Sequence, residues 1–108
     1  MMDIDILERN VRDAASLLKS LSNDRRLMIV CELSSGEKSV GALEERVGLT
    51  QSALSQHLAR LRKDGIVRTR RDSQRIYYSL ADENVGRMLE TLTDLYCAAG
   101  KPKKDEAA

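Results

Sequence analysis

The spacing of apolar residues predicts a mainly helical chain. In residues 3–21 apolar side chains recur every three or four positions, as expected for one amphipathic helix, at Ile4, Leu7, Val11, Ala14, Leu18 and Leu21. A second helix, capped by Ser22 or Asn23, is apolar almost all round over residues 25–33 and ends at Gly36. We expect this second helix to be the buried centre of the fold.

A short third helix is predicted from Ser39 or Val40 to Val47, and a turn at residues 48–50 joins it to a fourth helix. The fourth helix is capped by the hydroxyl of Thr50 and stops at Gly65. Two helices joined by a three-residue turn that contains glycine are typical of a helix-turn-helix, whose second helix enters a DNA groove. An ordinary helical hairpin is the alternative interpretation.

The fourth helix has two distinct faces when its residues are placed about 100° apart. Its apolar stripe consists of Leu54, Leu58 and Leu61. The opposite face carries Ser52, Gln56, Ala59, Arg60 and Lys63, with Gln51 and Ser55 on its shoulder. Amides can bond adenine and cations can bond guanine in the major groove. The alternative is a merely solvated face, although such faces are more often built from Glu and Lys pairs.

Two β-prone runs follow the fourth helix, over residues 66–71 and 74–80. Apolar and polar side chains alternate along them, which predicts a two-stranded hairpin with its tip at Asp72 and Ser73. Arg70, Arg71 and Arg75 flank that tip. Arginines in such a position can contact phosphates or enter a narrow minor groove.

A long last helix begins at the capping residue Asp82, and its apolar stripe comprises Val85, Met88, Leu89, Leu92, Leu95 and Tyr96. Gly86 lies inside this helix at a cost of roughly 1 kcal/mol, which suggests that another element approaches its backbone closely. Together with the first helix, this stripe is our candidate dimer surface. The alternative is that it covers the core of its own chain.

Length and composition limit the size of the core. The chain has 108 residues, with no Trp and no Phe, so Leu, Ile, Val and Met must supply most of the burial. We expect one domain over residues 1–100, completed by pairing into a homodimer. Residues 101–108 are polar and are expected to form a disordered tail.

The net charge of +1 conceals an uneven distribution. Residues 60–75 contain seven cationic and two acidic side chains, a net charge of +5, which is the electrostatic pattern expected of a protein that binds nucleic acid. Residues 82–97 contain one cationic and four acidic side chains, a net charge of −3. We therefore expect the last helix to face away from DNA.

The amino end is acidic and lacks the pattern of a secretory signal, and no stretch approaches 18 apolar residues. The sequence therefore predicts a cytoplasmic protein with no membrane contact. In that reducing compartment the two cysteines are not expected to form a permanent structural disulfide.

The order helix, helix, helix-turn-helix, arginine-rich hairpin and helix resembles the winged-helix repressors of the ArsR/SmtB family over residues 14–98. Its most specific segments are LKSLSNDRRL at residues 18–27, SVGAL at 39–43 and LTQSALSQHL at 49–58. The resemblance implies a mainly α winged helix-turn-helix with five helices and a two-stranded β-hairpin wing. It also implies a homodimer, paired through its first and last helices, that binds an inverted-repeat operator in double-stranded DNA and responds to an inducer.

Many members of that family sense metals through a Cys-x-Cys pair near the third helix or through His and carboxylate ligands on the last helix. This chain has no cysteine in residues 37–49 and no histidine in the last helix. Zinc and soft-metal sites need several thiolate or imidazole ligands. We therefore expect no metal site and no cofactor, and a metal-responsive repressor is a minor alternative.

Cys31 in the second helix and Cys97 near the end of the last resemble the cysteines of the thiol-based branch of the family, the BigR, SqrR and HlyU types. In that branch the equivalent cysteines become bridged by a disulfide or a polysulfide chain. The resemblance thus implies a redox switch, Cys31 with Cys97, that responds to reactive sulfur species or oxidants. The alternative is that the cysteines only fill space, as in a NolR-type regulator with a very similar fourth helix and no thiol switch.

The sequence as a whole predicts a DNA-binding transcriptional repressor and no enzyme. The residues predicted to contact DNA are Gln51, Ser52, Ser55, Gln56, His57, Arg60, Lys63, Arg70, Arg71 and Arg75. A thiol enzyme is one rival, but the single histidine, His57, lies on the fourth helix outside any recognisable nucleophile constellation. A winged-helix protein-interaction module is the other, and the basic hairpin argues against it.

Overall fold

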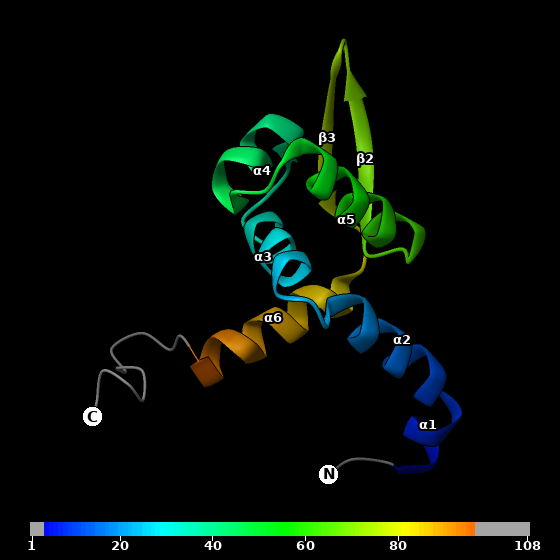
Figure 1. Ribbon diagram of the computed structural model, residues 1–108. Helices are drawn as coiled ribbons and strands as arrows, with labels where there is room; N and C mark the ends of the chain where they lie inside the picture. The colour runs from blue at the N-terminus through cyan, green and yellow to red at the C-terminus, as the bar shows by residue number, and fades with distance from the viewer. Residues whose placement is uncertain (1–3, 97–108) are drawn as a thin grey trace, which may run out of the picture.

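A computed structural model describes residues 4–96 and confirms a mainly helical fold with a small antiparallel sheet (Figure 1). The helices of this part are α1 (Ile4–Arg9), α2 (Val11–Leu21), α3 (Asp24–Leu33), α4 (Val40–Val47), α5 (Gln51–Lys63) and α6 (Glu83–Tyr96). The strands are β1 (Lys38–Ser39), β2 (Val67–Asp72) and β3 (Arg75–Leu80), in the sheet order β1-β3-β2.

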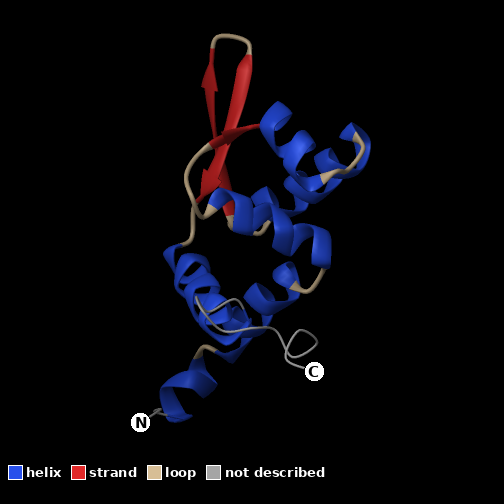
Figure 2. Ribbon diagram, turned by 90° about the vertical axis from the view of Figure 1, so that its left-hand side faces the viewer, coloured by secondary structure: helices blue, strands red, loops and turns tan. Residues whose placement is uncertain are grey.

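The elements are arranged so that the DNA-binding candidates lie at one end of the molecule. The hairpin of β2 and β3, which we call the wing, projects beyond α4 and α5, whereas α1, α2 and α6 lie at the opposite end (Figures 1 and 2). The wing and α4 therefore lie at the opposite end of the molecule from the predicted dimer surface, whereas the end of α5 reaches α2 through the hydrogen bond between Ser20 and Asp64.

The core lies around α3 and α5, as the apolar pattern predicts. Ile29, Val30 and Leu33 of α3 are buried, which confirms α3 as the central helix. Further buried side chains come from α2, α4, α5 and α6 and from the start of β2 with the residue before it, and they are Leu21, Leu43, Val47, Leu54, Leu58, Leu61, Ile66, Val67, Val85 and Leu89.

Side-chain caps fix the start of the helices that carry the site. The Thr50 hydroxyl accepts a hydrogen bond from the Ala53 N–H at 3.1 Å, and the Ser39 hydroxyl accepts one from Ala42 at 3.2 Å. Gly48 ends α4 with a φ of +73°, a left-handed conformation that favours glycine. Gly48 and the Thr50 cap therefore define the short turn between α4 and α5.

The predicted first helix is divided into α1 and α2 at Asn10. The Asn10 amide Nδ2 donates to the Ile6 carbonyl at 2.9 Å, and the Asn10 backbone N–H donates to Leu7. The side chain thus takes the carbonyl that the backbone N–H of a continuous helix would use, which interrupts the ladder. The expectation of a single helix over residues 3–21 was wrong at this position, and the part of the chain described has six helices instead of five.

The sheet also differs in detail from the predicted two-stranded wing. Lys38 and Ser39 form a third strand that pairs with Tyr78 and Tyr77 of β3. Two residues are too few to show a strand period, so the sequence pattern could not reveal β1. The tip of the wing is Ser73 and Gln74, one residue later than predicted, because Asp72 pairs with Arg75 and Ser73 adopts a φ of +60°.

Gly86 was expected to allow close approach of another element, and this expectation is wrong within residues 4–96. A methyl group added at Gly86 would meet nothing within 4 Å. The glycine lines an open pocket between the end of α3 and α6, together with Ser34 and Leu89. The cap that starts α6 is as predicted, because Asp82 Oδ1 accepts a hydrogen bond from the Asn84 N–H at 2.9 Å.

Two sequence predictions fall outside the described residues. These are the position of Cys97 and the polar tail at residues 101–108. None of the helices in residues 4–96 combines the length and the apolar character that a membrane crossing requires.

Candidate nucleic-acid interface

α5 has the two faces that its sequence predicts. Leu54 and Leu61 are fully buried and Leu58 is 2% exposed, so the leucine stripe holds the helix against the core. The predicted DNA contacts that are exposed on this helix are Gln51, Ser52, Ser55, Gln56, Arg60 and Lys63. His57 is half-buried at the edge of the face. The first half of α5 therefore offers amides and hydroxyls that can bond the edges of bases.

Arg60 is engaged within the protein. Its Nε donates to Asp64 Oδ2 at 2.9 Å, one turn further along. The same Asp64 oxygen accepts a hydrogen bond from the hydroxyl of Ser20 in α2 at 2.5 Å. The Ser20 hydroxyl, together with Arg60, holds the pKa of the Asp64 carboxyl below its usual value. Arg60 is thus paired within the protein, whereas Lys63 has no ion-pair partner among the described residues.

The strand register divides the arginines of the wing between its two faces. Arg71 lies opposite Ile76, on the face that also carries Tyr78. Arg70 lies opposite Tyr77 on the other face, which Arg75 shares. The three arginines predicted to flank the tip therefore do not form one cluster.

Arg70 is bound to an acidic side chain from a distant part of the sequence. Its Nε and NH2 groups donate to the two carboxylate oxygens of Glu37 at 2.9 and 2.7 Å, a bidentate pair. Its guanidinium also lies 4.8 Å from the centre of the Tyr77 ring. The hydrogen bonds from Arg70 lower the pKa of Glu37, and Glu37 raises the pKa of Arg70. Arg70 therefore joins the wing to the chain just before β1.

Arg71 and Arg75 are exposed, and neither has a salt-bridge partner among residues 4–96. They are the predicted wing contacts that keep an uncompensated positive charge. Because phosphate contacts depend on accessible cations, these two side chains are the better candidates for contact with the DNA backbone.

A groove between α4, the start of α5 and the wing brings the predicted helix and wing residues together. Gln51 and Ser55 of α5 line one side, and Arg75 and Ile76 of β3 line the other. Gln74 at the wing tip also lines the groove, although the sequence reasoning missed it. Its place on the groove wall depends on the turn geometry, for which glutamine gives no local signal.

The predicted switch residue Cys31 is exposed on α3, away from the groove. Its predicted partner, Cys97, lies outside the described residues. The structure does place the end of α3 beside α6, because Ser34 lines the same pocket as Glu90 and Asp94. Among residues 4–96, no three His, Cys, Asp or Glu side chains are grouped so that they could hold a metal ion.

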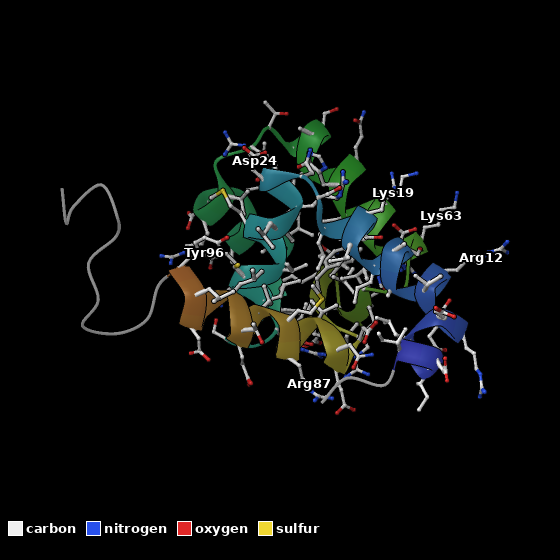
Figure 3. The ribbon with its side chains drawn as sticks, turned by 90° about the horizontal axis from the view of Figure 1, so that it is seen from below. Arg12, Lys19, Asp24, Lys63, Arg87 and Tyr96 are labelled. Atoms are coloured by element: carbon white, nitrogen blue, oxygen red, sulfur yellow. The ribbon has the colours of Figure 1, made fainter. Side chains whose placement is uncertain are left out.

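The end of α2 lies against the end of α5. The Ser20 hydroxyl of α2 donates to Asp64 at the end of α5. Figure 3, which views the molecule from below, labels the residues that precede these two in the sequence, Lys19 and Lys63. The sequence reasoning missed both Ser20 and Asp64, because neither a serine on a helix nor an aspartate after one is a distinctive signal.

Comparison with known proteins gives consistent matches. Residues 23–69 match the model of the family described as bacterial regulatory protein, arsR family. The chain is 48% identical over 100 residues to the transcriptional activator HlyU of Vibrio cholerae, and the match covers 93% of each protein. The structure of reduced HlyU from that organism superposes with a TM-score of 0.80 at 50% identity, covering 84% of this chain and 96% of that one.

Two further structures extend the match. The transcriptional repressor BigR from Xylella fastidiosa superposes with a TM-score of 0.86 at 42% identity, over 90% of this chain and 99% of that one. The homodimeric winged helix-turn-helix DNA-binding domain Mb0332 from Mycobacterium bovis, a possible ArsR-family regulator, superposes with a TM-score of 0.72 at 32% identity, over 82% and 83% of the two chains.

Proposed function

The chain belongs to the ArsR family of bacterial regulatory proteins, and on that basis we propose that it is a homodimeric repressor that binds an inverted-repeat operator and is released by oxidation of a Cys31–Cys97 dithiol. The coarser part of this statement is established by the relatives: the protein is a DNA-binding transcriptional regulator and not an enzyme. We also propose a cytoplasmic location, which is where a DNA-binding regulator of this bacterial family would act.

The observation that carries the operator-binding proposal is the exposed face of α5 beside the wing groove. Gln51, Ser52, Ser55 and Gln56 are exposed on the first half of the helix, where hydrogen-bond donors and acceptors can reach base edges in the major groove. Gln56 is our choice for bidentate contact with an adenine. Arg71, Arg75 and Lys63 supply contacts with phosphates, which position the helix without reading the sequence.

The proposed homodimer is supported by apolar side chains that the single chain leaves uncovered. Leu18 of α2 is 55% exposed, and Leu95 and Tyr96 of α6 are 68% and 70% exposed. Ile4, Ile6, Leu7 and Val11 add to this surface from the first two helices. Exposed apolar patches of this kind mark contacts between subunits. A related domain is described as homodimeric.

The two-fold symmetry of the proposed dimer determines the symmetry of the operator. Two copies of α5 related by a two-fold axis dock in successive major grooves, about 34–36 Å apart, and require half-sites in inverted orientation. The proposed operator is therefore an imperfect palindrome.

The thiol switch is the finer part of the proposal. Cys31 is exposed on α3, and the pocket shared by Ser34 and Asp94 brings the neighbourhood of Cys31 close to the second half of α6. Cys97 follows Asp94 by three residues in the sequence. Formation of a disulfide removes two protons and two electrons from the two thiols, and a polysulfide or peroxide accepts the electrons. A bridge would tie α3 to the dimer helix α6 and so change the relative position of the two α5 helices.

The test combines operator binding with mass spectrometry. The operator is first selected from a pool of random duplexes, and an inverted repeat is expected. Polysulfide should then link Cys31 to Cys97, as seen in the peptide mass, and release the wild-type protein from DNA. Cys31→Ser and Cys97→Ser proteins should stay bound under the same treatment. If both variants are released as readily as the parent, the regulator has no thiol switch at these residues.

A further inference from the structure

The contact between α2 and α5 is built around a buried hydroxyl. In the part of the chain that the structure describes, Ser20 is the one polar residue in the buried class, with an exposed fraction of 1%. Its hydroxyl donates to Asp64, which lies 44 residues later in the sequence. We call Ser20, Asp64 and Arg60 the α2–α5 joint. A buried hydroxyl that lost its acceptor would be left without a hydrogen bond, so the contact favours one fixed arrangement of the two helices.

The α2 side of the joint is held in place by α3. Arg26 Nε donates to the Ser20 carbonyl at 2.6 Å, and Arg26 NH2 donates to the Lys19 carbonyl at 3.4 Å. The bond to Ser20 satisfies a carbonyl that the last turn of α2 leaves free, whereas the Lys19 carbonyl also accepts from the backbone N–H and the hydroxyl of Ser22. The backbone that carries the Ser20 hydroxyl is therefore held in place by Arg26 of α3.

The α5 side of the joint is not explained by helix preferences. Asp64 follows the last residue of α5, where the carboxylate meets the negative end of the helix dipole. The position is also surrounded by the cations of the basic segment that is expected to face DNA. A carboxylate here weakens both the helix end and the basic field, and its contacts with Arg60 and, over a long range in the sequence, with Ser20 offset this cost.

The two helices that meet at the joint have different proposed roles. Leu18, two residues before Ser20, is exposed on the surface assigned to the dimer, whereas α5 carries the polar face assigned to bases. We propose that the α2–α5 joint fixes the angle of α5 relative to the dimer surface, which makes Ser20 and Asp64 positioning residues for operator recognition. This inference rests on the proposed homodimer and its inverted-repeat operator.

Half-site spacing is the quantity that such a joint controls. Inserting one base pair between half-sites moves them about 3.4 Å apart and rotates them by about 35°. With a rigid joint, the two α5 helices of the dimer cannot move to match the new spacing, whereas with a loosened joint they can. A merely structural contact would lower stability without altering the preference for one spacing.

The experiment uses the full chain and the inverted repeat that the wild-type protein selects from random duplexes. Affinity is measured for that duplex, for versions with one base pair inserted or removed at the centre, and for an unrelated duplex. The variant is Ser20→Ala, and the matched control is Ser16→Ala, which changes an exposed serine on the same helix. Wild type and Ser16→Ala should lose at least about tenfold on insertion. Ser20→Ala should lose less than about threefold, with non-specific binding unchanged.

A second pair of variants keeps the inference testable if Ser20→Ala folds poorly. Asp64→Asn retains an oxygen that can accept from Ser20 and should keep the spacing preference, whereas Asp64→Ala should lose it as Ser20→Ala does. If wild type, Ser20→Ala and Asp64→Ala prefer one half-site spacing to the same degree, the inference about the joint is wrong, whereas the proposed function is unaffected. If the wild-type protein selects no inverted repeat, the proposed operator is wrong and the inference fails with it.

Discussion

The first prediction concerns the salt dependence of DNA binding by the wing. Its size follows from which wing arginines are already paired within the protein. Arg71 and Arg75 are exposed and have no salt-bridge partner among residues 4–96, so each is assigned one phosphate contact. Replacing both with alanine removes about four phosphate contacts from a dimer. Each contact contributes about 0.9 to the slope of log K against log salt concentration, so the slope should decrease in magnitude by about 3.6. Between 50 and 200 mM salt, the variant should therefore lose about 150-fold less affinity than the wild type does.

A matched control removes one arginine and one carboxylate together. Arg70 NH2 lies 2.7 Å from Glu37 Oε1, so Arg70→Ala with Glu37→Gln eliminates an internal ion pair and leaves the net charge unchanged. This variant should weaken binding through loss of wing position, while its salt slope stays within about 1 of the wild-type value.

The assay is fluorescence anisotropy with a labelled duplex over that range of salt. An unchanged slope in the Arg71→Ala, Arg75→Ala protein would refute the assignment of the uncompensated wing charges to phosphates. A decrease of about 1.8 in the control, half as large because it removes only one arginine from each subunit, would show that Arg70 exchanges Glu37 for phosphate when DNA binds.

Three further predictions concern the core, the dimer and pH. Leu58→Ala should lower the free energy of unfolding by about 2–5 kcal/mol in urea denaturation, whereas Ser52→Ala on the opposite face of α5 should change it by less than about 0.5 kcal/mol. Leu18→Glu should shift sedimentation from dimer to monomer and reduce operator binding, and an unchanged sedimentation coefficient would exclude this face of α2 from the interface. Because the Ser20 hydroxyl and Arg60 lower the pKa of Asp64 in the folded state, its stabilising effect is complete above the unfolded pKa of about 3.9 and is lost as pH falls through the lower folded value. The difference in stability between wild type and Asp64→Asn should therefore shrink as the pH is lowered from about 5 to 3, and a difference that grows would contradict the assigned contact.

The sequence by itself determined the order of the helices from α3 to α6 and which faces they bury. Leu54, Leu58 and Leu61 recur at helical spacing and are all buried, and the polar residues between them are exposed, apart from the half-buried His57. The alternation along residues 66–80 likewise fixed which residues of the wing share a face. Periodicity succeeds here because burial is decided one element at a time, by the repeat of the helix or strand itself. The Thr50 cap and the Gly48 turn are local for the same reason.

Only the tertiary structure decided which charged side chains have no internal partner and are therefore available to contact DNA. Arg70 and Arg71 are neighbours in the sequence, yet Arg70 is bound to Glu37, 33 residues earlier, and Arg71 is not paired within the described residues. Ser20 and Asp64 meet across 44 residues. Such contacts depend on where two distant segments are brought by the packing of the core, and no local repeat encodes that meeting. The sequence thus identified the surface that we propose binds DNA, and the fold determined which of its cations remain free of internal partners.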